Sequence, residues 1–437
     1  MVISFVGSGG KTTAIFTLAA HLREQGRRVL VTTTTRMYTP LGLAAAGRSL
    51  PLYDDRFFSR EGSIFDIQCR LERDGFCLAG VIPPGEDGHK LAPLPPSIYE
   101  KACLLADDVL VEADGARSFF LKYPAPHEPV IPANTEEIRV LYGHQAVGRP
   151  LGEVTQRLSL ALEILRGSGF PHLTEDTPVT PAIVGRLYER GYLTPLRKRF
   201  SHIPVKLFSG GDGERKKLGC VVMASGFSRR FGENKLLCPF RGKPLFQWCL
   251  EALPMEELER VTVVTRYPQL EPLCREFGVT LLLHDHPARS DTIRLGVETM
   301  EGLDGCLFTV ADQPLCRRET LTALVTAFRV EPGQPARLSW GEKMGNPVLF
   351  PAGLFSSLAA LKGEQGGGCV LPEMVTQLPV SHPDELTDVD TPETLAELER
   401  SDLDGTECSM CISSKTENWS RPRVSGVPTL PWRAGRS

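Results

Sequence analysis

The chain has 437 residues, of which 41% are hydrophobic and 23% charged, and its formal net charge at pH 7 is −4. These values are typical of a globular protein with roughly two to four domains, and they exclude the basic field that attracts nucleic acids or membrane surfaces. No apolar run reaches the roughly 18–20 residues of a membrane span, and the apolar start at residues 1–6 is too short for a signal peptide. We therefore expect a cytoplasmic protein that binds neither nucleic acid nor membrane.

The first elements predict a strand–helix–strand unit. Residues 2–6 form a short apolar run, and residues 12–25 carry apolar side chains at helical spacing before Gly26. Val29-Leu30-Val31 then begins a second strand. This order is typical of a parallel sheet covered by helices.

A glycine-rich turn, Gly7-Ser-Gly-Gly-Lys-Thr-Thr13, joins the first strand to the helix. A helix N-terminus with free amides favours an anion, but the commonest phosphate loop has a glycine six residues before its lysine, and that position is Phe5. The shorter pattern resembles the ATP loops of Mur-type ligases. We favour nucleotide binding over a plain turn with a solvated lysine. The proposed nucleotide-binding residues are Gly7, Gly10, Lys11, Thr12 and Thr13, and Lys11 would contact the β- and γ-phosphates.

The next informative strand, Val109-Leu110-Val111, leads into Glu112 and Asp114. Alternate residues of a strand face the same side, so both carboxylates can serve one metal site together with Thr12. The alternative is a strand that simply ends in a polar turn.

The segments 7–13, 29–37 and 111–132 together resemble the YqeC family, the accessory proteins of selenium-dependent molybdenum hydroxylases. The resemblance covers most of residues 1–200. It implies that Thr32–Thr35, Lys122 and His127-Glu128-Pro129 line the same site. It also implies a role in the maturation of such hydroxylases, but it does not identify a reaction.

Two helices are expected at residues 152–166 and 181–190, the second capped by Thr180 with Pro181 in its first turn. The basic triplet Arg197-Lys198-Arg199 is interpreted as a solvated face. Residues 209–217 are small or charged and predict a linker between domains 1–208 and 218–400.

A second glycine turn follows the strand that begins at Leu218. Residues 218–235 read LGCVVMASGFSRRFGENK, which resembles the signature of nucleotidyltransferases of the MobA/MocA group. Small residues let backbone amides approach a triphosphate, and Arg230 and Lys235 would neutralise the α-phosphate and the leaving pyrophosphate. The nucleotide-binding residues expected here are Ala224, Ser225, Gly226, Ser228 and Gly232.

Further strands are predicted at 261–265, 279–283 and 306–310, and the same resemblance continues along them. Ser290–Gly296, with Arg294, matches the loop that reads the base, although Asp291 is unusual there. Asp312 follows a strand and is the expected Mg²⁺ ligand, with Asp390 of the Asp-Val-Asp-Thr-Pro-Glu segment as a second one. Gly345-Asn346-Pro347 has Asn in place of the family's His.

Other features are given less weight. His284-Asp285-His286 has no third ligand nearby and is interpreted as a solvated loop. Residues 401–437 are expected to be a disordered tail, in which Cys408 and Cys411 are incidental thiols. The remaining cysteines, for example Cys103, Cys220, Cys249 and Cys306, are expected to be free, mostly buried thiols.

We therefore expect an α/β protein with two three-layer domains and mainly parallel sheets: an N-terminal P-loop-like domain and a C-terminal Rossmann-like nucleotidyltransferase domain. The resemblances imply Mg²⁺-dependent transfer of CMP from CTP to the terminal phosphate of molybdenum cofactor, with ATP or GTP at the N-terminal site. They also imply an apo-hydroxylase partner. Ala224, in place of a second glycine, tilts the base choice towards cytosine. A sugar-phosphate nucleotidyltransferase and a non-catalytic cofactor chaperone gated by nucleotide remain as alternatives.

Overall fold

The computed structural model describes residues 1–400, except residues 46, 48, 49, 51, 53, 116–118, 211–214 and 233. The predicted opening unit is confirmed: strand β1 spans Val2–Gly7, helix α1 Lys11–Glu24 and strand β2 Val29–Thr33. Gly10 precedes α1 in a left-handed conformation (φ 117°), which glycine adopts without a steric cost. The expected tail, with Cys408 and Cys411, lies outside the described residues.

The first sheet has seven strands in the order β11-β9-β1-β7-β2-β5-β4, and all its neighbouring pairs are parallel. Its remaining strands are β4 Phe58–Ser59, β5 Phe76–Ala79, β7 Asp108–Glu112, β9 Glu137–Tyr142 and β11 Val205–Ser209. Phe5 of β1 is level with Glu112 of β7. The glycine turn after β1 and the acidic end of β7 therefore meet at one edge of the sheet.

The helices of this half are α2 Pro40–Ala45, α3 Ile64–Asp74, α4 Pro96–Cys103, α5 Leu151–Val154, α6 Leu158–Arg166, α7 Pro181–Tyr188 and α8 Thr194–Arg199. The continuous helix predicted at 152–166 is wrong, because β10 (Thr155–Gln156) interrupts it to pair with β8 (Leu121–Lys122). The second prediction is confirmed at its start, where Thr180 accepts a hydrogen bond from the amide of Ile183. Its end differs, since a short π-helix at Glu189–Leu193 follows Tyr188. A small hairpin pairs β3 (Met37–Tyr38) with β6 (Lys90–Leu91).

The second sheet has the order β16-β15-β12-β17-β19-β18-β20. Its strands are β12 Leu218–Ala224, β15 Arg260–Thr265, β16 Thr280–Leu283, β17 Gly305–Val310, β18 Ala336–Trp340, β19 Lys343–Pro351 and β20 Thr376–Pro379. The three strands predicted from sequence in this half are confirmed as β15, β16 and β17. The sheet is parallel from β16 to β17, whereas β19 runs antiparallel to both its neighbours.

Helices cover both faces of the second sheet, as expected for three layers. They are α9 Leu245–Ala252, α10 Glu271–Glu276, α11 Arg289–Glu298, α12 Arg318–Val330, α13 Phe355–Ala359 and α14 Pro392–Arg400, beside the hairpin β13 (Pro239–Phe240) and β14 (Lys243–Pro244). Alternate residues of β12 enter different cores: Cys220 packs with α9 and α12 residues, and Val221 with α11 and α13 residues. This alternation is the signature of a sheet buried on both faces.

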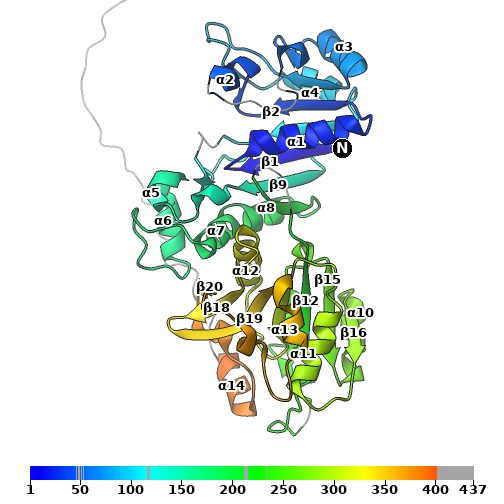
Figure 1. Cartoon of the computed structure of the whole chain (residues 1–437), viewed down its shortest axis with the longest axis vertical. Helices are drawn as coiled ribbons and strands as arrows, with labels where there is room; N and C mark the ends of the chain where they lie inside the picture. Colours follow the sequence, from blue (N-terminus) through cyan, green and yellow to red (C-terminus); the bar gives the residue numbers. More distant parts are fainter. Residues whose placement is uncertain are drawn as a thin grey trace, which may run out of the picture.

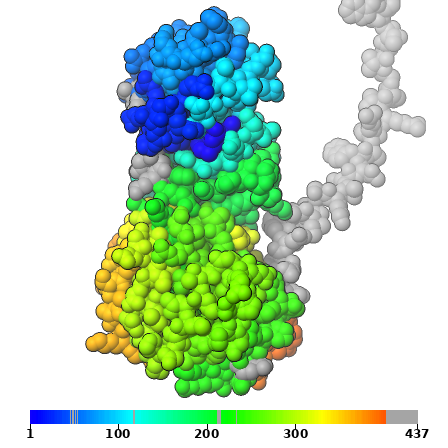
Figure 2. All heavy atoms as spheres, turned by 90° about the vertical axis from the view of Figure 1, so that its right-hand side faces the viewer, coloured from blue at the N-terminus to red at the C-terminus, as the bar shows by residue number. Residues whose placement is uncertain are grey.

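The two sheets lie at opposite ends of the molecule, with α7 and α12 between them (Figure 1). The space-filling view shows the same division, with the N-terminal part in blue and cyan at one end and the C-terminal part in green to orange at the other (Figure 2). Gly185 of α7 faces the carbonyl of Ala323 in α12 so closely that a β-carbon would stand 2.4 Å from that oxygen. Beside this contact, Arg197, Arg215 and Arg329 all pair with the buried carboxylate of Glu257. The solvated face predicted for Arg197 is therefore wrong, because its guanidinium is needed to neutralise Glu257.

Cys103, Cys220, Cys249 and Cys306 are not in disulfides; the last three are buried as expected, and Cys103 is half-buried. Within that part of the chain, no helix combines the length and apolarity needed to span a bilayer.

Candidate functional site

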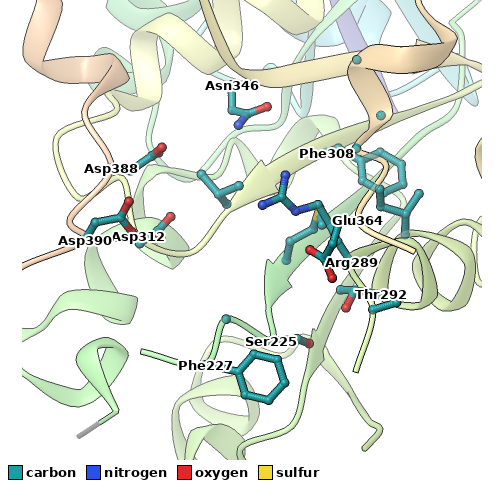
Figure 3. A pocket seen from close by; sticks show the side chains of 18 of the residues that line it. Ser225, Phe227, Arg289, Thr292, Phe308, Asp312, Asn346, Glu364, Asp388 and Asp390 are labelled. Atoms are coloured by element: carbon teal, nitrogen blue, oxygen red, sulfur yellow. The ribbon is translucent and has the colours of Figure 1, made fainter. Parts of the chain in front are cut away.

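A cavity of about 930 Å³ opens over the carboxyl ends of β12 and β17. Figure 3 shows Asp312, Asp388 and Asp390 gathered on one side, with Ser225 and Phe227 of the glycine turn below them and Arg289, Thr292 and Phe308 across the hollow. Crevices at the carboxyl ends of parallel strands are the usual ligand sites of open α/β sheets. Because β12 and β17 are adjacent and Met223 is level with Val310, the glycine turn and Asp312 share this edge.

The glycine turn is held from behind by residues that follow β15. Arg266 donates through Nε to the carbonyl of Ser225 (2.8 Å), and the hydroxyl of Tyr267 donates to the carbonyl of Gly226 (2.6 Å). Arg266 also lies 3.8 Å from the ring centroid of Phe227. Ser225, Gly226 and Ser228 line the cavity. Ala224 is buried in β12, and Gly232 turns the chain at φ 74°.

The ammonium of Lys235 joins the two proposed metal-binding carboxylates. Its Nζ lies 2.6 Å from Oδ2 of Asp312 and 2.9 Å from Oδ1 of Asp390, and it also donates to the carbonyl of Val389 (2.8 Å). Burial lowers the pKa of Lys235, but the two carboxylates outweigh burial and leave that pKa raised. Lys235 therefore stays charged beneath the turn.

Asp388 also lines the cavity, although the sequence predicts no role for it. Its Oδ1 accepts a hydrogen bond from Nε2 of Gln313 (2.9 Å). Burial, and next the charge of Asp312, raise the pKa of Asp388. Arg230, by contrast, is 73% exposed and lies 3.9 Å from Asp390, at the open rim of the cavity.

Two sequence interpretations change here. Arg294 does not line the cavity: it pairs with Asp291 and Glu298 on its own helix, while Thr292 and Ile293 do line it. The solvated loop predicted at residues 284–286 is confirmed for Asp285 and His286, which are exposed. It is wrong for His284, whose Nε2 lies 2.7 Å from Oγ of Ser225. Because Ser225 donates to the carbonyl of Val264 (3.0 Å), its oxygen accepts from His284. Burial lowers the pKa of that imidazole.

Sequence reasoning missed Arg266, Arg289 and Arg337 as lining residues. Arg266 follows β15 directly and Arg337 lies within β18, which is a weak signal, and Arg289 begins α11.

The N-terminal glycine turn surrounds one carboxylate, Asp114, which is fully buried. Asp114 accepts from the amide of Gly7 (3.0 Å) and the hydroxyl of Tyr192 (3.0 Å), and pairs with Lys11 (3.1 Å) and Lys122 (3.3 Å). Lys11 also donates to the carbonyl of Gly7 (2.7 Å). The side chain of Asp114 thus connects the glycine turn, the segment after β7 and the π-helix after α7.

Two of the residues that the resemblance to YqeC implies for this site, Lys122 and Glu128, lie in this cluster. Thr12 donates to Glu112 (3.2 Å). Burial raises the pKa of Glu112. Lys122 also pairs with Glu128 (2.9 Å), which Arg157 contacts in turn (3.0 Å). Thr13 follows in the first turn of α1, and His127 is exposed.

Carboxylate oxygens are the ligands that Mg²⁺ prefers, and it commonly takes only one or two of them together with substrate phosphates and water. The described residues contain no group of three or more His, Cys, Asp or Glu side chains arranged for a metal. At the second site, two carboxylate oxygens already share one cation, Nζ of Lys235. Asp312 and Asp390 can thus both contact a single cation, as the two carboxylates of such a Mg²⁺ site must.

Comparison with known proteins separates the chain into the same two regions. Residues 220–378 match the family model of the MobA-like NTP transferase domain, and residues 3–159 match that of the YqeC protein.

Three relatives illustrate these matches. A probable molybdenum cofactor guanylyltransferase of Bacillus licheniformis is 40% identical over 24% of this chain and 53% of its own length. An uncharacterized YqeC protein of Escherichia coli is 33% identical over 34% and 53%. The crystal structure of Rv0371c from Mycobacterium tuberculosis aligns with 43% of this chain and 99% of its own, at 21% identity and a TM-score of 0.38. The chain spans about half the length of the two curated relatives.

Proposed function

We propose, from the family matches and the cavity, that residues 218–400 form a nucleotidyltransferase domain joined to a nucleotide-binding domain at residues 1–208. The domain would transfer CMP from CTP to the terminal phosphate of molybdenum cofactor during maturation of a molybdenum hydroxylase. The observation that carries this proposal is Lys235 beneath the glycine turn, with Asp312 and Asp390 both in contact with its ammonium.

In this reaction an oxygen of the acceptor phosphate attacks the α-phosphorus of CTP, a new P–O bond forms, and the bond to the β-phosphate breaks to release pyrophosphate. The chain supplies positioning and positive charge. Lys235 would neutralise the negative charge that develops on the phosphates, and Arg230 at the open rim would contact the leaving pyrophosphate. When bound between Asp312 and Asp390, Mg²⁺ would add further neutralisation of the triphosphate.

The glycine turn supports a close approach of phosphate. A β-carbon added at Gly226 would meet no protein atom within 4 Å, so internal packing does not account for the glycine. The space that a side chain would fill is left open beside the backbone amides, as phosphate binding requires.

The choice of CTP follows from Ala224 in the resemblance to the MobA/MocA group, whereas the Bacillus licheniformis relative is named a guanylyltransferase. CTP and GTP must therefore be tested side by side. In this structure Ser225, next to Ala224, is hydrogen-bonded to His284, which fixes the turn at the point where the two bases would be told apart.

The N-terminal domain would bind ATP or GTP at Gly7, Gly10, Lys11, Thr12 and Thr13. Thr12 and Glu112 are in contact at the start of α1, and they are the pair we assign to Mg²⁺. Asp114 is also a proposed ligand from the sequence, but it already binds two ammonium groups, an amide and a hydroxyl. We assign Asp114 instead to holding Lys11 and the turn in place.

The test is the full chain with molybdenum cofactor and CTP, GTP or ATP in turn, with pyrophosphate release as the readout. Release that requires both CTP and the cofactor supports the proposal. Turnover with a sugar 1-phosphate and without the cofactor would identify a sugar-phosphate nucleotidyltransferase. Maturation of an apo-hydroxylase that proceeds unchanged with Asp312→Ala would identify a non-catalytic chaperone.

A further inference from the structure

An arginine occupies a position of the second sheet where the strand pattern calls for an apolar side chain. Arg337 of β18 is level with Val348 of β19, and Val348 is level with Phe308 of β17. The three side chains line the same cavity. Val348 and Phe308 belong to the apolar core of that face. The neighbours of Arg337 along β18, Ala336 and Leu338, belong to the core of the opposite face.

The guanidinium of Arg337 has no partner in the described part of the chain. Its Nε is buried and makes no hydrogen bond, and the ion pairs among the described residues do not include it. Burial alone lowers the pKa of Arg337, so no neighbouring carboxylate compensates for the lost water. A partly buried cation without a counter-charge destabilises the folded state. When such a cation lines a cavity, it indicates that a ligand supplies the missing negative charge.

The strand order places Arg337 on the far side of the cavity from the nucleotide turn. The turn follows β12, Asp312 follows the adjacent β17, and β19 and then β18 come next. Two strand spacings separate β17 from β18, which amounts to roughly 10 Å. A nucleotide held by the turn and by Asp312 leaves the β19–β18 side of the cavity to the acceptor.

The wall between these two points is apolar. Phe308, Val348 and Phe350 line it, and the rings of Phe308 and Phe350 meet edge to face with centroids 5.6 Å apart. An acceptor that crosses this wall would make apolar contacts with it.

We propose that Arg337 binds an anionic group of the acceptor that is distinct from its attacking phosphate. This inference rests on the proposed nucleotidyl transfer and narrows its substrate class. The acceptor presents its reactive phosphate near Asp312 and a second anionic group at Arg337, with contacts to Phe308 and Val348 between them. Arginine suits this role because its planar fork can donate two parallel hydrogen bonds to one anion.

The test measures binding and not turnover. Molybdenum cofactor, released anaerobically from a purified molybdenum enzyme, is titrated into the full chain by calorimetry, and CTP is titrated separately. Arg337→Gln should weaken cofactor binding by about 10-fold to 100-fold and change CTP binding by less than about twofold. Arg337→Lys keeps the charge but loses the planar fork, so its affinity for the cofactor should lie between those of Arg337→Gln and the unmodified chain. Arg275→Gln is the control, because Arg275 is 79% exposed and pairs with Glu271 on its own helix.

Cofactor binding that is unchanged in Arg337→Gln overturns the inference, and so does an equal loss of cofactor and CTP binding, which would indicate a structural role. Failure of the proposed function is seen separately: the unmodified chain would then release no pyrophosphate with CTP and cofactor, whatever the titrations of Arg337→Gln show.

Discussion

The ammonium of Lys235 lies 2.6 Å from the carboxylate of Asp312, although 77 residues separate the two along the chain. The contact forms because β12 and β17 are neighbouring parallel strands, so the segments that follow them meet at one edge. The same ammonium reaches Asp390, 155 residues away. One cation thus joins three of the segments that resemble the nucleotidyltransferase signature.

Replacing Lys235 by Met should reduce pyrophosphate release with CTP and cofactor by about 10²-fold to 10³-fold, as is typical when one preorganised charge at a developing anion is removed. The readout is the initial rate at saturating nucleotide. Lys343→Met is the matched control, because Lys343 is exposed on β19 and does not line the cavity. Equal rates for the two variants would contradict the role of Lys235.

Replacing Asp312 by Asn should abolish the response to Mg²⁺, because one of the two proposed carboxylate ligands loses its charge. The measurement is Mn²⁺ binding by electron paramagnetic resonance in the presence of CTP. Since the charge of Asp312 contributes to the raised pKa of Asp388, that pKa should also fall in the variant. Asp285→Asn, an exposed change outside the cavity lining, should bind Mn²⁺ as the unmodified chain does.

The two glycine turns should be separable by a pair of variants. Lys11→Ala should remove binding of labelled ATP by the full chain and leave CTP binding intact, and Lys235→Ala should do the reverse. The reason is that each ammonium lies at the start of its own turn-to-helix segment, 4% and 7% exposed respectively. ATP binding that persists in Lys11→Ala would remove the nucleotide role of the N-terminal turn. Thermal unfolding of both variants checks that they are folded.

Glu257→Gln should lower the free energy of unfolding by about 3–5 kcal/mol, because it leaves Arg197, Arg215 and Arg329 without their shared counter-charge. Burial raises the pKa of Glu257, but the three arginines outweigh burial and lower it from 4.5 to about 2. The stabilisation from this group is therefore complete above pH 4.5 and is lost as the pH falls towards 2.

Urea unfolding between pH 7 and pH 2 measures both effects, and the variant should show a shallower loss in the acid range. Glu256→Gln is the control: Glu256 also contacts Arg197 (2.9 Å) but is 29% exposed. Its removal should cost less than about 1 kcal/mol. Equal costs for the two changes would argue against the buried cluster as the source of the stability.

Gly185→Ala should destabilise the protein, although the same change in an open helix stabilises it by about 1 kcal/mol. The added carbon would meet the carbonyl oxygen of Ala323 at 2.4 Å and the β-carbon of Ala327 at 3.0 Å, so α7 and α12 must separate. A cost of about 1–3 kcal/mol is expected by chemical denaturation. Gly333→Ala is the control, since its β-carbon would meet nothing within 4 Å. A stabilised Gly185→Ala protein would mean that the helices are not closely packed in solution.

Much of the fold could be predicted from local patterns in the sequence. Apolar runs such as 109–111 and 306–310 became strands because a strand buried on both faces needs apolar side chains at nearly every position. The predictions failed where a local pattern competed with a distant partner. Thr155 and Gln156 left their predicted helix to pair with Leu121 and Lys122, and a partner 34 residues away leaves no mark in the periodicity of the helix.

The sequence by itself determined the two glycine turns, the strands that precede them and the acidic residues that follow later strands, because each is a local pattern of backbone freedom and hydropathy. Only the tertiary structure decided which charges meet. It placed Lys235 between Asp312 and Asp390, buried Arg197 against Glu257, and left Arg337 unpaired within the described part of the chain. The physical reason is that electrostatic partners are set by strand order and register, which bring together residues that no spacing along the chain relates.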